Sequence, residues 1–506
     1  MDLLITGMRK NSIGIGVKKT LLKKWKFNIP SRYFNTLPES LREAKEEELI
    51  QLRNSILWIL YLNDLREEKR RAILEKMLKY RAHIEKELKT HPALNPAVVF
   101  LILPKKERQT LVSHIRDVLK KIEHHKTITT RLLLNLIGYI WDKHLTFSEN
   151  EYRFLLELSK NPAGSFREWS RNTGLSLSGI KKIYEKLRKK ISLRIISMVN
   201  FNALKLKHYF IHVRNIHRRE FSEELKNSFM KLFWNRSVMR FASDPKVLTI
   251  SMLIPSHGKC IRNFIKNIHL LEKTKKIKID VYEVKEIFKS YNFSIFDPKV
   301  GWRFSPNEWK NLVERNVEEL NRFNSISIHR MIYTTIPDFK LSKEDLRLIS
   351  MLNMDFRIGN TVLKEVLKQS PSFISRRKKE FLEKGILIPV FDTAINLPND
   401  VLIICEGSSE TLDKVFYSSL YLPFVIGYRA KDIFSNTNLL FLYIRLHSAT
   451  IWDFIQICKE LKKKIGLKEI YYEYQGTYCR SLDRFIERWD EEKQHWIWYT
   501  EDFKLM

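Results

Sequence analysis

A stretch at residues 148–200 occurs twice in this chain, and the repeat restricts the fold more than any other feature. The first copy has helix periodicity that is interrupted at Asn161-Pro162-Ala163-Gly164 and again at Gly174. The pattern returns without a gap 194 residues later. The matching positions are Ser148 with Ser342, Leu155 with Ile349, Leu158 with Leu352, Trp169 with Leu363, Ser176 with Ser370, Ser178 with Ser372, Ile180 with Ile374, and Leu187 with Phe381. We infer a duplication.

Each copy predicts three short amphipathic helices followed by extended chain. In the first copy we expect a helix at 149–159 and a second helix that begins after Ser165, which has a glutamate at the capping-box spacing. A third helix starts at Ser176 or Ser178 and reaches residue 190, and residues 191–200 alternate as a small hairpin would. In the second copy we expect the third helix at 372–384 and a strand at 386–391. This order is typical of a winged helix-turn-helix.

The third helices are strongly basic. Between Ser178 and Arg194, seven basic residues stand against a single acid, Glu185. A helix that enters the major groove needs positive charge beside short polar side chains, to neutralise phosphates and reach base edges. The side chains expected to face the groove are Ser176, Ser178, Lys181, Lys182, Ser372, Ser375, Arg376 and Arg377. Those expected nearer the phosphates are Arg167, Arg171, Lys186, Lys189, Arg194, Lys378 and Lys379.

After each copy the hydrophobic period changes from helical to alternating, in the order βαββαβ. That order is typical of a ferredoxin-like unit. We therefore predict an α+β fold, with an N-terminal all-α domain followed by two tandem units of a winged helix and a ferredoxin-like domain. The expected domains are a basic arm and helical domain at 1–145, a winged helix at 146–202, a ferredoxin-like domain at 203–295, a helical connector at 296–340, a second winged helix at 341–398, a second ferredoxin-like domain at 399–480, and a tail at 481–506.

Composition points to an anionic partner and to the cytoplasm. The chain has 506 residues, a formal net charge of +32 and a pI near 9.8. Nucleic acid is the first candidate for such a chain and an acidic membrane surface the second. A Lys/Asn/Ile-biased genome is the alternative explanation of the charge. The four cysteines lie far apart without a C-x-x-C pair, which is typical of a reduced compartment and predicts no metal site. No apolar run reaches transmembrane length, so we expect no membrane partner.

The chain resembles the Lrp/AsnC (feast/famine) transcription regulators, as two fused copies. The motif that carries the resemblance is Leu175-Ser176-Leu177-Ser178-Gly179-Ile180-Lys181-Lys182, with Ser372-Phe373-Ile374-Ser375-Arg376-Arg377 and Glu383-Lys384-Gly385-Ile386 in the second copy. The resemblance covers roughly residues 146–290 and 341–480. It implies DNA binding through the third helix and pairing of the ferredoxin-like units sheet to sheet, here within one chain.

Several positions depart from the family pattern. Tyr184 and Lys378 stand where the family has aliphatic residues. The Gly-x-x-Asp effector turn is replaced by Ser243-Asp244-Pro245-Lys246 in one copy and by residues 432–438 in the other. A small-molecule effector is therefore left open. Residues 1–145 have no counterpart in the resemblance, and we expect them to serve as a scaffold or to bind a second copy or a protein partner.

The sequence leaves two alternatives to DNA binding open. The alternatives are an RNA- or ribonucleoprotein-associated protein, and winged helices that contact only proteins. Tyr209, Phe441 and Tyr443 are candidates for RNA stacking, but no basic-Gly-aromatic motif surrounds them. His124-His125 and His208 with His212 lack a third metal ligand. The siroheme decarboxylases, which the chain resembles in fold only, are enzymes on this scaffold. No nucleotide or nucleophile motif is present, so we expect no cofactor and no enzymatic activity.

Overall fold

The computed structural model describes residues 30–43, most of 47–73, isolated helical positions between 105 and 119, and 147–504 with short gaps. The gaps in the last range are 192, 215, 217–218, 242, 300, 316–327, 394–396, 398, 448–449, 473 and 476–480. The chain divides into an N-terminal unit, residues 1–146 with 447–449, and a C-terminal unit, residues 147–446 and 450–506. Most of the basic arm and helical domain expected at 1–145 lies outside the described residues.

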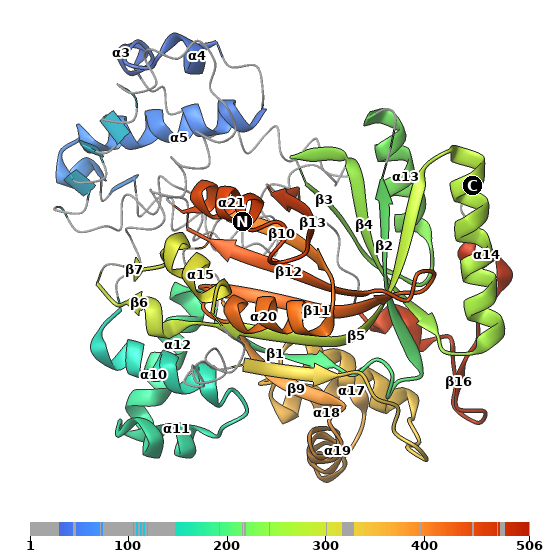
Figure 1. Ribbon diagram of the computed structural model, residues 1–506. Helices are drawn as coiled ribbons and strands as arrows, with labels where there is room; N and C mark the ends of the chain where they lie inside the picture. Colours follow the sequence, from blue (N-terminus) through green and yellow to red (C-terminus); the bar gives the residue numbers. More distant parts are fainter. Residues whose placement is uncertain are drawn as a thin grey trace. The chain divides into compact units, whose positions relative to one another are not determined.

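The described part of the N-terminal unit is helical. Its helices include α3 (Ser31–Phe34), α4 (Glu39–Arg42) and α5 (Glu47–Asn63) (Figure 1). Tyr33 is buried, and its hydroxyl donates a hydrogen bond of 2.9 Å to Asp64 just beyond α5. Ile56 and Ile59 of α5 are fully buried. These contacts hold α3 against the end of α5.

The C-terminal unit begins with three helices whose ends are set by local capping. They are α10 (Glu149–Lys160), α11 (Phe166–Thr173) and α12 (Leu177–Lys190). Ser148 and Ser165 each close a capping box with the glutamate three residues later. Gly174 ends α11 with φ of 69°, a left-handed conformation that glycine adopts without strain. We call α10–α12, together with strand β1 (Arg194–Val199), the first head.

The second copy of the repeat folds in the same way. Its helices are α17 (Lys343–Met354), α18 (Asn360–Leu367) and α19 (Pro371–Glu383), followed by strand β9 (Leu387–Asp392). Ser342 forms a capping box with Asp345, which is the position that corresponds to Glu151 of the first copy. Leu363, Ile374 and Phe381 are fully buried in its core. We call α17–α19 and β9 the second head.

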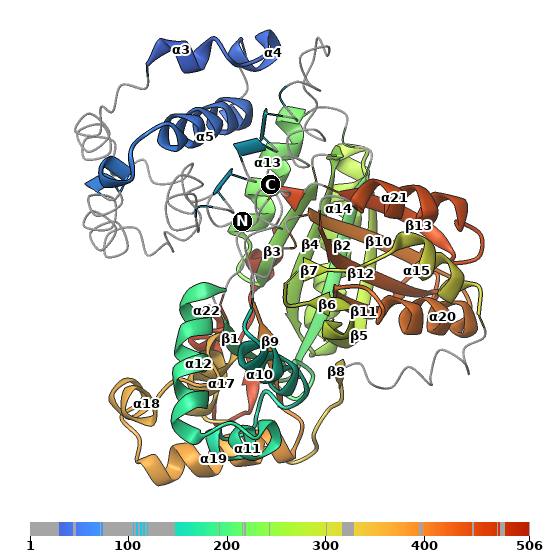
Figure 2. The same ribbon diagram turned by 90° about the vertical axis from the view of Figure 1, so that its left-hand side faces the viewer.

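The hairpin expected at 191–200 is not formed. Within the described residues this stretch is the single strand β1, and it pairs antiparallel with β9 of the second head. Alternation along a sequence predicts a strand but does not name its partner, which here lies almost 200 residues away. Ile196 faces Val390, which is its own equivalent 194 residues later. The two heads are therefore related by a local two-fold axis through this pair of strands (Figure 2).

Each head is followed by strands and helices in the order strand, helix, strand, strand, helix, strand. In the first half these are β2 (Leu206–Arg214), α13 (Arg219–Lys231), β3 (Asn235–Phe241), β4 (Asp244–Pro255), α14 (Gly258–Lys275) and β5 (Lys278–Tyr291). In the second half they are β10 (Asn399–Glu406), α20 (Ser409–Ser419), β11 (Phe424–Asp432), β12 (Asn438–Leu446), α21 (Ile451–Glu460) and β13 (Leu467–Tyr472). The mixture of helix and sheet confirms the expected α+β class.

The strands of the two halves join into one sheet that closes on itself. Its order is β13-β10-β12-β11-β5-β2-β4-β3-β14, so that β11 of the second half pairs with β5 of the first. Strand β14 (Tyr474–Gln475) continues β13 along the chain and pairs with β3. Phe210 of the first half contacts Tyr428 and Phe441 of the second across the interior, at ring-centroid distances of 4.9 and 5.1 Å.

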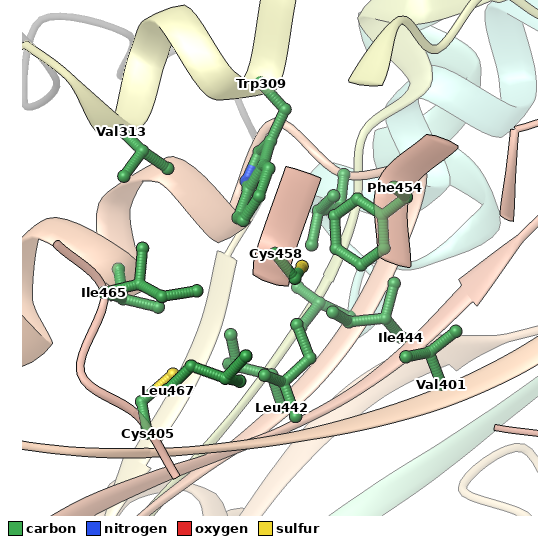
Figure 3. Close-up of a cluster of buried hydrophobic side chains, with 14 of the residues drawn as sticks. Trp309, Val313, Val401, Cys405, Leu442, Ile444, Phe454, Cys458, Ile465 and Leu467 are labelled. Atoms are coloured by element: carbon green, nitrogen blue, oxygen red, sulfur yellow. The ribbon is translucent and has the colours of Figure 1, made fainter. Parts of the chain in front are cut away.

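Helices cover the outer face of this sheet, and the side chains between helices and strands form a hydrophobic core. In the second half, α20 and α21 pack on β10, β12 and β13 together with α15 (Pro306–Val313) (Figure 1). Figure 3 shows Trp309 and Phe454, whose ring centroids lie 4.8 Å apart, above the strand residues Val401 and Leu442. The two sulfur-bearing side chains Cys405 and Cys458 are buried in the same cluster. Burial of this apolar surface is the main stabilising contribution in this half.

The connector between the halves contains more than the expected helix. Besides α15, it includes strands β6 (Phe296–Asp297), β7 (Gly301–Trp302) and β8 (Ile328–Ile332), and β8 pairs with β5. The C-terminal tail contains α22 (Asp483–Ile486), β15 (Trp489–Asp490), β16 (His495–Trp496) and the 3-10 helix η3 (Thr500–Phe503). Among the described residues, none of the helices has the length and apolar character needed to cross a bilayer.

Candidate nucleic-acid interface

The N-terminal part of α12 presents the exposed polar and basic residues that the sequence predicted. Ser176 is the N-cap, and its Oγ accepts a hydrogen bond of 3.1 Å from the backbone N–H of Gly179. Ser178, Lys181 and Lys182 are exposed. The N-terminus of a helix also carries a partial positive charge. The exposed serine, the exposed lysines and this partial charge all favour phosphate contact at this end of α12.

The other predicted cations of the first head differ in their surroundings. The Lys186 Nζ lies 2.7 Å from Oε1 of Glu151, a carboxylate that is almost fully buried beneath α12. Burial alone would raise the pKa of Glu151. The hydrogen bonds from Lys186 and from the Ser148 backbone have the larger effect and bring this pKa below its ordinary value, so the carboxylate stays ionised. The side chain of Lys189 lies outside the described part of the chain. Lys186 is thus partly neutralised within the first head.

Three predicted arginines of the first head lie on its surface. Arg167 and Arg171 are exposed on α11, and Arg194 at the start of β1 is about half exposed. The Arg194 guanidinium lies 3.1 Å from Oδ2 of Asp392 at the end of β9. This ion pair joins the two heads at the edge of the β1–β9 ladder.

In the second head, the start of α19 repeats the arrangement of α12. The Oγ of Ser370 accepts a hydrogen bond of 3.2 Å from the Phe373 N–H and lies 2.9 Å from the Oγ of Ser372. Ser372, Ser375 and Arg376 are exposed. Lys379 is three-quarters exposed, and its Nζ lies 3.6 Å from Glu383.

Two predicted residues of α19 point inward and leave the candidate interface. The guanidinium of Arg377 is 12% exposed and makes hydrogen bonds of 2.6 and 2.7 Å to the carboxylate of Asp345. The ammonium of Lys378 donates a hydrogen bond of 2.7 Å to the Phe356 carbonyl and lies 3.9 Å from the centre of that ring. Burial lowers the pKa of Lys378 to about 8. Both cations are therefore used inside the second head.

Arg357 ties the heads together, although no pattern in the sequence indicated it. Arg357, in the turn after α17, donates a hydrogen bond to the carbonyl of Gly164, and its guanidinium lies 4.3 Å from the centre of the Trp169 ring. Asn353 donates a further hydrogen bond of 2.5 Å to the Ser197 carbonyl. In sequence, Arg357 looks like any other exposed basic residue of a turn. These contacts join α17 and the turn after it to α11 and β1 of the first head.

A second group of charges that the sequence did not predict lies beneath the β1–β9 ladder. The Lys289 side chain on β5 is 5% exposed, and its Nζ lies 2.6 Å from Oδ1 of Asp392. Burial raises the pKa of Asp392, but the nearby charges of Lys289, Arg194 and Arg445 lower it to about 2. Asp392 is therefore an ionised link between β9, β1 and the closed sheet.

Two of the histidines considered as metal ligands and two of the aromatic residues considered for RNA stacking are buried in the interior. His212 is fully buried, with Nδ1 3.0 Å from Thr249 Oγ1 and Nε2 2.5 Å from Glu469. His208 is also buried, and His124-His125 lies outside the described residues. Tyr209 and Phe441 are buried against other rings. Among the described residues, no group of histidine, cysteine or carboxylate side chains has the arrangement of a metal site.

Comparison with known proteins gives weak structural likenesses. No protein-family model matches the chain, and no curated protein matches its sequence. A crystal structure of the siroheme decarboxylase NirDL is 12% identical, with a TM-score of 0.40 over 66% of this chain and 92% of that chain. The same enzyme in complex with an iron-uroporphyrin III analogue has a TM-score of 0.39 over the same shares, again at 12% identity. The protein PH0061 is 14% identical, with a TM-score of 0.21 over 27% of this chain and 92% of its own.

These neighbours correct one expectation. The sequence led us to expect no enzymatic activity, and this is contradicted because NirDL is an enzyme. We therefore withdraw that expectation. The likeness is too weak to carry the decarboxylase activity, its substrate or any of its residues over to this chain.

Proposed function

We propose that this chain is a DNA-binding transcription regulator that reads duplex DNA with two helix-turn-helix heads, which share the β1–β9 ladder in place of separate wings, each head being followed by a ferredoxin-like unit. The observation that carries the proposal is the exposed start of α12, where Ser178, Lys181 and Lys182 surround a helix N-terminus. Short polar side chains reach base edges and lysines neutralise phosphates, so this combination fits a major groove. The resemblance to Lrp/AsnC regulators in the same motif agrees with this assignment.

The two heads contribute unequally to the proposed interface. In the first head Lys181 and Lys182 are exposed, whereas in the second head the adjacent cations Arg377 and Lys378 are turned into the core. Arg376 and Lys379 remain as the exposed cations of the predicted set on α19. Because the heads are related by a local two-fold axis, α12 and α19 present these unlike residues to two half-sites of opposite orientation.

We therefore expect the preferred DNA site to have two dissimilar halves. Selection of sites from random duplexes should give a sequence without a palindrome, because the reading residues differ at each head. Replacing Arg376 by alanine should relax the preference in one half by roughly 1–3 kcal/mol per lost base contact and leave the other half unchanged. Selection of a perfect palindrome by a dimer that tolerates deletion of the second head would contradict this reading.

A lysine pair on α12 tests the proposed contact with phosphates. The double variant Lys181→Ala/Lys182→Ala should bind all duplexes more weakly and lower the salt slope of binding by about two. The matched control is Lys462→Ala/Lys463→Ala, which removes two adjacent exposed lysines after α21. Affinity is measured by fluorescence anisotropy over a salt series, with structured RNA as competitor. A preference for RNA at every salt concentration, or equal losses in both variants, would exclude the proposed interface.

A further inference from the structure

Helix α14 carries a line of four cations that the two heads do not use. Lys259, Arg262, Lys266 and Lys273 are all exposed. Their spacings of three, four and seven residues place them on one stripe of the helix, because an α-helix turns once every 3.6 residues. The opposite stripe is buried against the sheet and the tail through Cys260, Phe264, Ile268 and Leu271. We call the four exposed residues the cation row; it extends over about 21 Å of helix.

The charge of the cation row is not neutralised by neighbouring acids. Within the described part of the chain, none of its four members lies within 4 Å of a carboxylate oxygen. The sole acid of α14, Glu272, is half-buried and accepts a hydrogen bond of 3.0 Å from the Ile279 N–H. A merely solvated helix face usually mixes its signs, as α21 does.

The duplication supplies an internal comparison for this row. The residues 194 positions after Lys259, Arg262 and Lys266 are Asp453, Gln456 and Glu460, and all three are exposed on α21. The buried positions correspond as well, with Cys260 matched by Phe454 and Phe264 by Cys458. The buried positions are thus apolar in both helices, whereas the three aligned exposed positions are basic in α14 and acidic or neutral in α21, whose exposed cation is Lys459 at another position. A general bias of composition toward lysine would not produce this difference.

The residue two positions before α14 is linked by a chain of hydrogen bonds to the segment that leads into the second head. The N–H of Ser256, just before α14, donates a hydrogen bond of 3.0 Å to the Lys205 carbonyl. The Lys205 Nζ donates a hydrogen bond of 2.7 Å to the Gln494 carbonyl. The Gln494 side chain makes two hydrogen bonds of 2.9 Å to the backbone of Leu341, which leads into α17. Figures 1 and 2 show α14 along one side of the closed sheet.

We propose that the cation row binds the phosphates of duplex DNA outside the two half-sites, so that the duplex bends past the second head onto α14. This inference rests on the proposed function. Cations in a line, without the short polar side chains of α12, are suited to phosphate contact and not to reading bases. About 21 Å of helix corresponds to roughly six base pairs of duplex, enough to place all four side chains against one stretch of backbone.

The test compares two duplexes and two variants of the full chain. One duplex ends at the selected site, and the other extends it by two helical turns, about 20 base pairs, on each side. In the variant Lys259→Ala/Arg262→Ala/Lys266→Ala we expect the salt slope for the long duplex to fall by about three, with no change for the short one. The control Lys459→Ala/Lys462→Ala/Lys463→Ala removes three exposed cations of the second half and should change neither.

The outcomes separate this inference from the proposed function. Failure of the unmodified chain to bind either duplex refutes the proposed function and this inference with it. Binding of both duplexes, with equal salt slopes for the row variant and the unmodified chain on the long duplex, refutes the cation row alone. Unchanged DNA binding together with a loss of binding to phosphatidylserine vesicles would instead identify the row as a membrane-surface contact and overturn its assignment to DNA.

Discussion

Replacing Trp496 with alanine is expected to lower the free energy of unfolding of the C-terminal unit by about 3–5 kcal/mol. The side chain is 3% exposed, and its Nε1 donates a hydrogen bond of 2.6 Å to the Leu204 carbonyl. Its ring centre lies 4.9 Å from that of Trp489 and 6.1 Å from that of Trp234. The substitution leaves both a large cavity and an unpaired carbonyl, and the two effects add.

The neighbouring residue provides a control for this substitution. His495 lies in the same short strand and is exposed, so His495→Ala should change stability by less than about 0.5 kcal/mol. Unfolding in urea followed by far-UV circular dichroism measures both variants without relying on tryptophan emission. Hydrogen exchange adds a local readout, because the Nε1 of Trp489 donates to the Leu341 carbonyl just before α17. The expectation is that packing of the tail stabilises α17. Unchanged hydrogen exchange in α17, or an equal loss of stability in the two variants, would contradict it.

The substitution Asp392→Asn is expected to lower the free energy of unfolding by a comparable amount, through a different mechanism. This substitution keeps the shape of the side chain but leaves the buried ammonium of Lys289, 2.6 Å away, without its counter-ion. Breaking a buried pair from one side costs about 3–5 kcal/mol, because the remaining charge is uncompensated. The double variant Lys289→Met/Asp392→Asn removes both charges, and we expect its stability to return to within about 2 kcal/mol of the unmodified chain. Equal stability of the single and double variants would show that the pair is not coupled.

The pKa of Asp392 gives this prediction a pH dependence. The pKa is about 2 in the folded chain, below the value of about 3.9 for an unfolded aspartate. A depressed pKa means that the unfolded state binds more protons, so the stability from this group is complete above about pH 4 and is lost as the pH falls toward 2. The difference in free energy of unfolding between the unmodified chain and Asp392→Asn should therefore become smaller as the pH falls through that range. A difference that stays constant from pH 6 to pH 2.5 would place the effect elsewhere.

The helices of the two heads could be predicted because their signals are local. Ser148, Ser165 and Ser342 each stand three residues before an acid, and the structure has a helix after each of them. The pairing of β1 with β9 could not be predicted, since alternation at 194–199 carries no information about a partner in the other copy. The expected hairpin was wrong for this reason. The link through Arg357 was equally invisible, because it depends on how the two copies pack.

The inward orientation of Arg377 and Lys378 could have been predicted. Both lie three or four residues from the buried Ile374 and from the buried Phe381, so helix geometry places them on the core face. In the first head the same positions hold Ile183 and Tyr184. The charge of the four basic residues alone predicts an exposed surface, whereas their spacing places two of them against the core. What the sequence did not show is the acid that Arg377 meets, because Asp345 approaches it from another helix.

The pairing of Ile196 with Val390 has a consequence for how this protein can change over time. In a dimer of identical chains, a residue on the symmetry axis meets a copy of itself, and every substitution alters both subunits together. Here the facing residues are unlike, and an arginine at one end of the ladder meets an aspartate. A substitution in one copy therefore leaves the other untouched, while the shared ladder holds both in register. The two halves of the fused chain can therefore change independently of each other. The aligned exposed positions of α14 and α21 show such a difference, because they are basic in α14 and acidic or neutral in α21.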